Sequence, residues 1–159
     1  MGPSGTGKST LALALAQSLG WRFIEGDSLH PVENLDKMAA GYPLDDADRA
    51  PWLARIAVSM REGGGNAVVT CSALRRSYRD QLREAGPALF VLPHVPREEL
   101  ARRLALREGH YMPGSLLDSQ LAALELPDQD EFAIILDGCL PLAAQVQRIT
   151  QALAGQQLP

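Results

Sequence analysis

The feature that most constrains this chain is a glycine-rich segment at its start. Residues Gly2 to Ser9 match the pattern G-x-x-x-x-G-K-[ST] in full, and Thr10 follows. Glycines let such a loop curl so that backbone N–H groups point inward at a phosphate, and the next helix adds its positive end. The alternative is a glycine-rich turn that caps an ordinary helix. The full motif opens an amphipathic helix, which favours the phosphate loop.

The motif assigns a role to each of its side chains. A lysine at the position of Lys8 reaches the β- and γ-phosphates, and a hydroxyl at the position of Ser9 binds Mg²⁺. We therefore predict that the chain binds ATP and Mg²⁺, with Lys8 as a catalytic group and Ser9 as the metal ligand. The predicted nucleotide-binding residues are Gly2, Ser4, Gly5, Thr6, Gly7, Lys8, Ser9 and Thr10.

Short apolar runs alternate with helical patterns along the rest of the chain. This alternation is typical of an α/β fold with a parallel sheet, and 159 residues suit a single domain. The expected strands are Trp21–Glu25, Ala67–Cys71, Leu89–Val95 and Phe132–Asp137. The expected helices are Lys8–Leu19, Pro31–Ala40, Ala50–Glu62, Ala73–Glu84, Arg97–Arg107, Ser115–Glu125 and Leu140–Ala154.

The strand that should precede the phosphate loop is missing from this sequence. A P-loop joins a strand to a helix, and here the loop begins at Gly2. In this topology that strand lies in the middle of the sheet, so its neighbours would keep unpaired backbone edges. We expect that the physiological protein begins upstream with several apolar β-branched residues. The alternative is a domain that tolerates the gap, for example as a homodimer whose second chain pairs these edges.

Composition and charge exclude several classes of partner. The net charge is -4 and no long basic run appears, so nucleic acid is a poor partner and a small molecule is expected. No stretch approaches the length of a membrane span, and no leader suggests export. Cys71 and Cys139 both end apolar runs, so we expect buried thiols and a cytoplasmic protein.

Polar residues that follow the strands are candidates for the second substrate, because ligands bind at the carboxyl ends of parallel strands. Asp27 follows the first expected strand and could accept the proton of an attacking hydroxyl or hold a Mg²⁺-bound water. Its alternative role is a cap for local N–H groups. Arg49 could grip a carboxylate with its planar fork. Its alternative is a surface pair with Asp45 or Asp46, which most simply form the acidic start of a helix.

Two basic clusters in the second half of the chain are further candidates. Arg75 and Tyr78 share a helix face that either covers the acceptor or is solvated. The strand before them lacks the aspartate of a Walker B motif, so Mg²⁺ would rest on Ser9, phosphates and waters. Arg103 and Arg107, an i, i+4 pair, are catalytic candidates in a lid at about residues 103–127. A solvated helix face is the alternative, and it holds for at least one arginine of this cluster, which also includes Arg102.

Long segments on the acceptor side closely resemble the gluconokinase family. The segments that carry the resemblance are Gly26–Pro31, Asn34, Lys37–Met38, Gly41–Leu44, Asp48–Leu53, Cys71–Asp80, Arg107, His110–Met112, Leu116–Leu117, Ser119–Gln120 and Leu124–Pro127. Together with the phosphate loop they cover nearly the whole chain. Tyr111 stands where the family generally has Phe, which keeps an aromatic ring.

This resemblance implies a three-layer α/β/α fold like that of nucleoside monophosphate kinases and shikimate kinase. It also implies phosphoryl transfer from ATP to the 6-hydroxyl of D-gluconate. Arg49 would hold the carboxylate, with His30, Arg75 and Tyr78 on the hydroxyls and Asp27 on the 6-hydroxyl. Two rivals stay open: a kinase of the same fold for another acceptor such as shikimate, and a nucleotide-binding protein without turnover.

Overall fold

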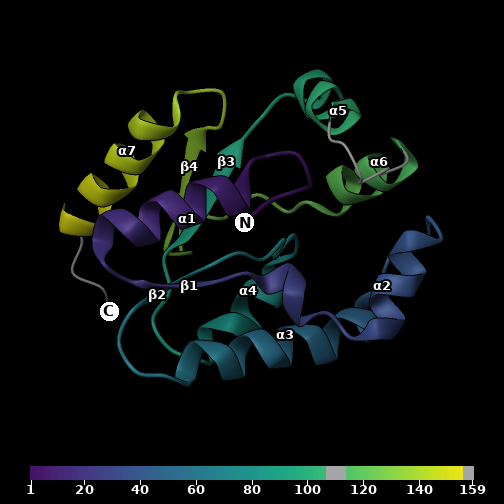
Figure 1. Cartoon of the computed structure of the whole chain (residues 1–159), viewed down its shortest axis with the longest axis horizontal. Coiled ribbons are helices and arrows are strands. Elements are labelled where there is room, and N and C mark those ends of the chain that lie inside the picture. The colour runs from purple at the N-terminus through teal and green to yellow at the C-terminus, as the bar shows by residue number, and fades with distance from the viewer. Residues whose placement is uncertain (107–113, 156–159) are drawn as a thin grey trace.

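The computed structural model describes residues 1–106 and 114–155 and contains every strand and helix expected above (Figure 1). No helix of this part of the chain is long and apolar enough to cross a membrane. The strands are β1 (Arg22–Ile24), β2 (Ala67–Val69), β3 (Phe90–His94) and β4 (Ala133–Asp137). The helices are α1 (Lys8–Leu19), α2 (Val32–Ala39), α3 (Asp46–Arg61), α4 (Arg76–Arg83), α5 (Arg97–Ala105), α6 (Gly114–Ala123) and α7 (Leu142–Gly155), with a 3-10 turn, η1 (Gly26–Leu29).

Two helices begin three or more residues away from the expected start, and each of these shifts has a local cause. Helix α3 begins at Asp46 because Asp45 and Asp48 form a capping box, in which each carboxylate accepts the other residue's backbone N–H. The interpretation of this acidic cluster as a helix start is confirmed. Helix α4 begins only at Arg76, because Ala73 has a φ of 40° and cannot belong to a right-handed helix.

The strands form the middle of three layers. In Figure 1, α1 and α7 lie on one side of the strands and α3 and α4 on the other. Neighbouring strand residues point to opposite faces, as the pleat requires. Those on the α3 and α4 side are Val69, Phe90 and Ala133, and those on the α1 and α7 side are Val68, Val91 and Ile134. The predicted three-layer α/β/α architecture is confirmed.

The sheet is interrupted in its middle. β1 pairs with β2 and β3 pairs with β4, both in parallel, but β2 and β3 do not pair within the described residues. The start of the chain lies between them: the Met1 amine donates to the Val91 carbonyl at 2.6 Å, and the Gly2 N–H donates to the Ser72 carbonyl at 2.8 Å. Beyond Met1 lies a cavity of about 350 Å³ with mostly apolar walls. The pKa of the Met1 amine is lowered to about 5, mainly by burial and in smaller part by the Lys8 charge.

The two cysteines differ in burial. Cys71 is buried as predicted, and burial raises the pKa of its thiol to about 12. The expectation of a buried Cys139 is wrong. Strand β4 ends at Asp137, and the exposed Cys139 lies in the turn that follows, where its N–H donates to the Asp137 carboxylate at 2.8 Å.

Candidate active site

The glycine-rich segment curls back on itself before α1. Gly2, Gly5 and Gly7 all have positive φ values, of 117°, 86° and 85°. Gly7 caps α1 without a side-chain hydrogen bond, so the first turn of the helix opens directly onto the loop. A Cβ atom at Gly7 would meet no atom within 4 Å, which shows that this side of the loop is open. This shape fits a phosphate group held by backbone N–H groups and a helix start.

Side chains of the loop bind its own backbone. Lys8 Nζ donates to the Pro3 carbonyl at 2.9 Å, so the ammonium lies over the loop. Thr6 is buried, and its hydroxyl donates to the same carbonyl at 3.0 Å. The Thr6 side chain therefore stabilises the conformation of the phosphate loop from within. Ser9 is half-buried in the first turn of α1, and Thr10 is exposed there.

Helices α5 and α6 reach the far side of the loop. Arg103 donates to the Gly5 carbonyl at 3.5 Å, to the Gly138 carbonyl at 3.2 Å and to Glu99 at 2.8 Å. From α6, the Gln120 side chain accepts the Ser4 N–H at 2.7 Å, a contact that no sequence motif indicated. Arg103 thus lies beside the phosphate loop, as its predicted role requires.

The other arginines of this cluster have different fates. Arg102 pairs with Glu99 and its side chain is 61% exposed, so the solvated-face alternative holds for this residue. Hydrogen bonds from Arg102 and Arg103 lower the pKa of Glu99 to about 2. Arg107, like Tyr111, lies outside the described residues. Its role and the lid therefore stay predictions.

Asp27 is presented by a tightly fixed segment after β1. The preceding Gly26 donates its N–H to the Thr70 hydroxyl at 2.9 Å and accepts the Trp52 indole N–H at 2.7 Å. A Cβ atom at Gly26 would collide with the Thr70 carbonyl oxygen, so only glycine fits here. In the described part of the chain the exposed Asp27 carboxylate binds no N–H group, which argues against a capping role. The charges of Asp27 and Lys8 both act on the pKa of the Cys71 thiol. Both residues therefore lie near the carboxyl end of β2, which Cys71 follows.

His30 lies near enough to Asp27 and Arg49 for both charges to act on its pKa. Its ring stacks on Trp52 with a centroid separation of 4.1 Å and an angle of 11°. Burial lowers the pKa of His30, the Asp27 charge raises it and the Arg49 charge lowers it. The lowered pKa favours the neutral imidazole, and the Asn34 amide donates to its Nδ1 at 3.3 Å, which leaves the ring proton on Nε2.

Tyr78 forms the centre of the predicted acceptor cluster. The Arg49 and Arg75 guanidinium carbons lie 5.7 and 5.9 Å from its ring centroid. Arg75 pairs with Asp46 through two bonds of 2.7 and 3.0 Å, and the Tyr78 hydroxyl donates to the same carboxylate. Arg49 donates to the Tyr78 hydroxyl at 3.3 Å and makes no ion pair within the described residues. The alternative interpretation of Arg49, a surface pair with Asp45 or Asp46, is therefore not realised in the described residues, because Asp46 pairs with Arg75.

Known proteins resemble this chain in sequence and in overall fold. A protein-family model described as an AAA domain matches residues 1–127. The gluconokinase of Gluconobacter oxydans (strain 621H) is 57% identical over 142 residues, which cover 87% of this chain and 80% of that protein. The crystal structure of a gluconokinase from Sinorhizobium meliloti 1021 is 44% identical, has a TM-score of 0.83 and is matched over 99% of this chain and 94% of its own.

A more distant structure agrees on the fold alone. The shikimate kinase of Aquifex aeolicus is 16% identical with a TM-score of 0.65, over 98% of this chain and 94% of that one. The shared architecture confirms the predicted P-loop kinase fold. The identities of 44% and 57% over most of each chain confirm the resemblance of the acceptor-side segments. The chain belongs to the gluconokinase family of P-loop kinases.

Proposed function

We propose that this protein transfers the terminal phosphoryl group of ATP to the 6-hydroxyl of D-gluconate, giving 6-phospho-D-gluconate. Gluconate carries a carboxylate at one end and a primary alcohol at the other. An enzyme for this reaction must grip the first and hold the second in line with the phosphate, because positioning supplies most of the catalysis. The described side chains offer groups for both tasks.

The observation that carries this proposal is the state of Arg49. It is half-buried beside Tyr78, it lies close enough to His30 to lower that residue's pKa, and it has no carboxylate partner within the described residues. A partly desolvated guanidinium without an anion favours an anionic ligand. The neighbouring Arg75 is already neutralised by Asp46, so Arg49 is the group that would bind the gluconate carboxylate, with Arg75, Tyr78 and His30 on the hydroxyls.

Asp27 and the phosphate loop serve the reacting end. The exposed Asp27 carboxylate would orient the 6-hydroxyl and accept its proton. Lys8 would bind the β- and γ-phosphates, and Ser9 would hold Mg²⁺, which neutralises the phosphate charges when bound. Arg103, beside Gly5, would neutralise charge that develops on the transferred group, and we assign the same task to Arg107.

The setting of the reaction follows from the same chemistry. A net charge of -4 supports a small-molecule acceptor over nucleic acid. Two free cysteines fit a reducing compartment such as the cytoplasm. We include a homodimer in this proposal because β2 and β3 have edges that no strand of the described residues pairs, and a second chain could cover them.

The test is an ADP-release assay with ATP, Mg²⁺ and a panel of acceptors that includes gluconate, other sugar acids and shikimate. Among these acceptors, we expect turnover only of gluconate. The variant Lys8→Ala should fold like the parent chain and lose this turnover. Preference for shikimate would support the rival acceptor. Nucleotide binding without turnover of any acceptor would support a protein that only binds nucleotides.

A further inference from the structure

The loop between β2 and α4 has an unusual backbone conformation. Among the described residues, Ala73 is the one non-glycine with a positive φ, at 40°, and it is buried. Residues with a Cβ atom disfavour this region, so the surrounding groups must hold the loop in place.

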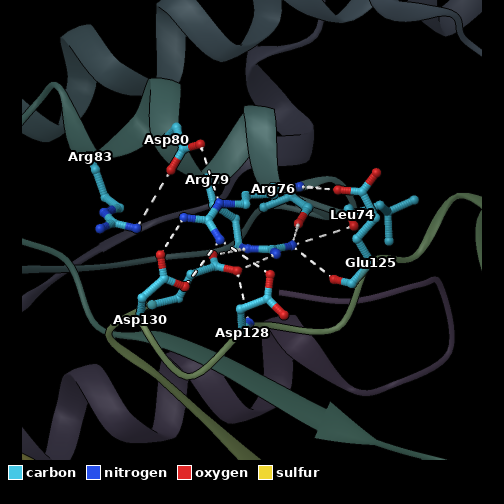
Figure 2. Close-up of polar contacts among 10 residues, drawn as sticks. Leu74, Arg76, Arg79, Asp80, Arg83, Glu125, Asp128 and Asp130 are labelled. Carbon is cyan, nitrogen blue, oxygen red and sulfur yellow. Dashed lines mark hydrogen bonds and ion pairs between the residues drawn. The ribbon is translucent and has the colours of Figure 1, made fainter.

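The guanidinium of Arg79 holds this loop. Its side chain is 0% exposed, and Nη1 donates to the carbonyls of Ala73 and Leu74, both at 3.4 Å, and of Glu125 at 3.0 Å. Nε and Nη2 donate to the two carboxylate oxygens of Glu131, at 2.5 and 2.7 Å. Figure 2 shows Arg79 between α4 and the segment around Glu125 and Asp128. Glu131 therefore fixes one edge of the fork, which aims the other edge at the loop.

The same loop connects the two halves of the candidate active site. On the phosphate side, the Ser72 carbonyl accepts the Gly2 N–H at 2.8 Å. On the acceptor side, the loop leads directly into Arg75 and the first turn of α4, which carries Tyr78. A displacement of this loop would therefore move the acceptor residues relative to the phosphate loop.

The segment after α6 closes the loop from outside. The Glu125 N–H donates to the Leu74 carbonyl at 2.8 Å, and its carboxylate accepts the Arg76 N–H at 2.6 Å, which caps α4. Glu125 follows the helix whose Gln120 binds the phosphate loop. Arg79 thus binds the loop and this segment at once.

We propose that Arg79 is a positioning residue that sets the placement of Arg75 and Tyr78 relative to the phosphate loop. It acts through the backbone of residues 73 and 74 and through Glu125, not by contact with a substrate. This role in acceptor binding rests on the proposed function. A lysine cannot replace Arg79, because a single ammonium group lacks the planar fork that binds the carboxylate and the three carbonyls together.

The first experiment compares Arg79→Lys with the matched control Arg83→Lys. Arg83 lies one turn along α4, its side chain is 36% exposed, and it forms a 3.5 Å ion pair with Asp80. For Arg79→Lys we expect kcat/KM for gluconate to fall by about tenfold or more. The dissociation constant of a non-hydrolysable ATP analogue should stay within about twofold of that of the parent chain. Hydrogen–deuterium exchange of residues 71–78, measured without substrates, should rise. Arg83→Lys should resemble the parent chain in all three measurements.

A double variant separates positioning from stability. Arg79→Met with Glu131→Leu replaces the buried pair by apolar groups, a change that often preserves or improves folding. We expect a folded protein that keeps nucleotide affinity but loses gluconate kcat/KM and shows fast exchange in residues 71–78. The proposal would be overturned if this double variant kept the kcat/KM and the exchange rates of the parent chain. It would also be overturned if Arg79→Lys lost nucleotide affinity by the same factor as kcat/KM for gluconate. If the parent chain does not phosphorylate gluconate, the proposed function fails, while the exchange data still decide whether Arg79 holds the loop.

Discussion

Two regions that border β2 are built in opposite ways. At its carboxyl end, the Arg79 cluster joins α4 to the segment of residues 125–131 through buried polar contacts (Figure 2). Along its side, the gap toward β3 is apolar, and Met1 and Gly2 bridge only one end of it. In the polar region, side-chain bonds within this sequence hold the loop before α4 and the segment after α6 together. The centre of the sheet depends instead on strand pairing, for which side chains offer no substitute.

The largest expected effect breaks the polar region. Glu131→Ala leaves the Arg79 guanidinium buried without its counter-ion, which should lower the free energy of unfolding by about 3–5 kcal/mol. Urea denaturation of the variant and the parent chain measures this difference. Asp130→Ala is the control, since its ion pair with Arg76 is exposed and should contribute less than about 1 kcal/mol. Equal effects of the two substitutions would contradict the contrast between buried and exposed pairs.

The second prediction uses pH to separate the two regions. In a chain that begins at Met1, its amine has a pKa of about 5 in the fold against 8.0 as its ordinary value, so the unfolded chain binds more protons between these values. Stability should therefore fall as pH drops from 8 to 5, by up to about 4 kcal/mol, and then level off.

The Arg79 cluster should respond in a more acidic range. Its hydrogen bonds to Glu131 lower the pKa of that carboxyl from 4.5, so the stability that it contributes is present above pH 4.5 and is lost as the pH falls through the lower value. Urea midpoints across the pH range measure both effects. Acetylation of the Met1 amine should abolish the loss between pH 8 and 5 and leave the acidic one. If acetylation changes neither, the buried amine is not the cause.

A third, smaller effect should come from filling the gap. An engineered extension of four Val and Ile residues before Met1 can pair with the free edges of β2 and β3 and bury its side chains between the helix layers. We expect a gain of about 2 kcal/mol, or about 4–8 °C in Tm. An extension of equal length with Pro at alternate positions cannot donate the ladder hydrogen bonds and is the control. Equal melting temperatures for the two extensions would show that the gap does not accept a strand.

The smallest expected effect sharpens the description of the acceptor cluster. Arg49→Lys keeps the charge beside Tyr78 but loses the planar fork, so kcat/KM for gluconate should fall about tenfold, equivalent to about 1.4 kcal/mol. Binding of an ATP analogue and the urea midpoint should stay unchanged. An equal loss in nucleotide binding would remove Arg49 from the role of carboxylate ligand.

The sequence by itself determined the elements, the phosphate loop and the family. These features are encoded locally: a glycine pattern sets the loop, and hydrophobic periodicity sets each strand and helix. Helix α1 has the bounds read from the sequence because Gly7 and Gly20 flank it with left-handed backbone conformations. The gap between β2 and β3 in the described residues also agrees with the expectation from the motif, which normally follows a strand.

Only the tertiary structure decided which charged groups are buried and paired. Arg75 is the N-cap of α4 and Arg79 lies four residues later within that helix, and nothing in the local sequence distinguishes them. Arg79 is buried because residues 125–131, about 50 positions later, fold over it with the carboxylate of Glu131. In the same way, only the fold shows that Asp46 pairs with Arg75 and not with Arg49, and that Gln120 of α6 accepts a hydrogen bond from the phosphate loop. Burial and partner choice depend on segments distant in the sequence, so local patterns cannot encode them.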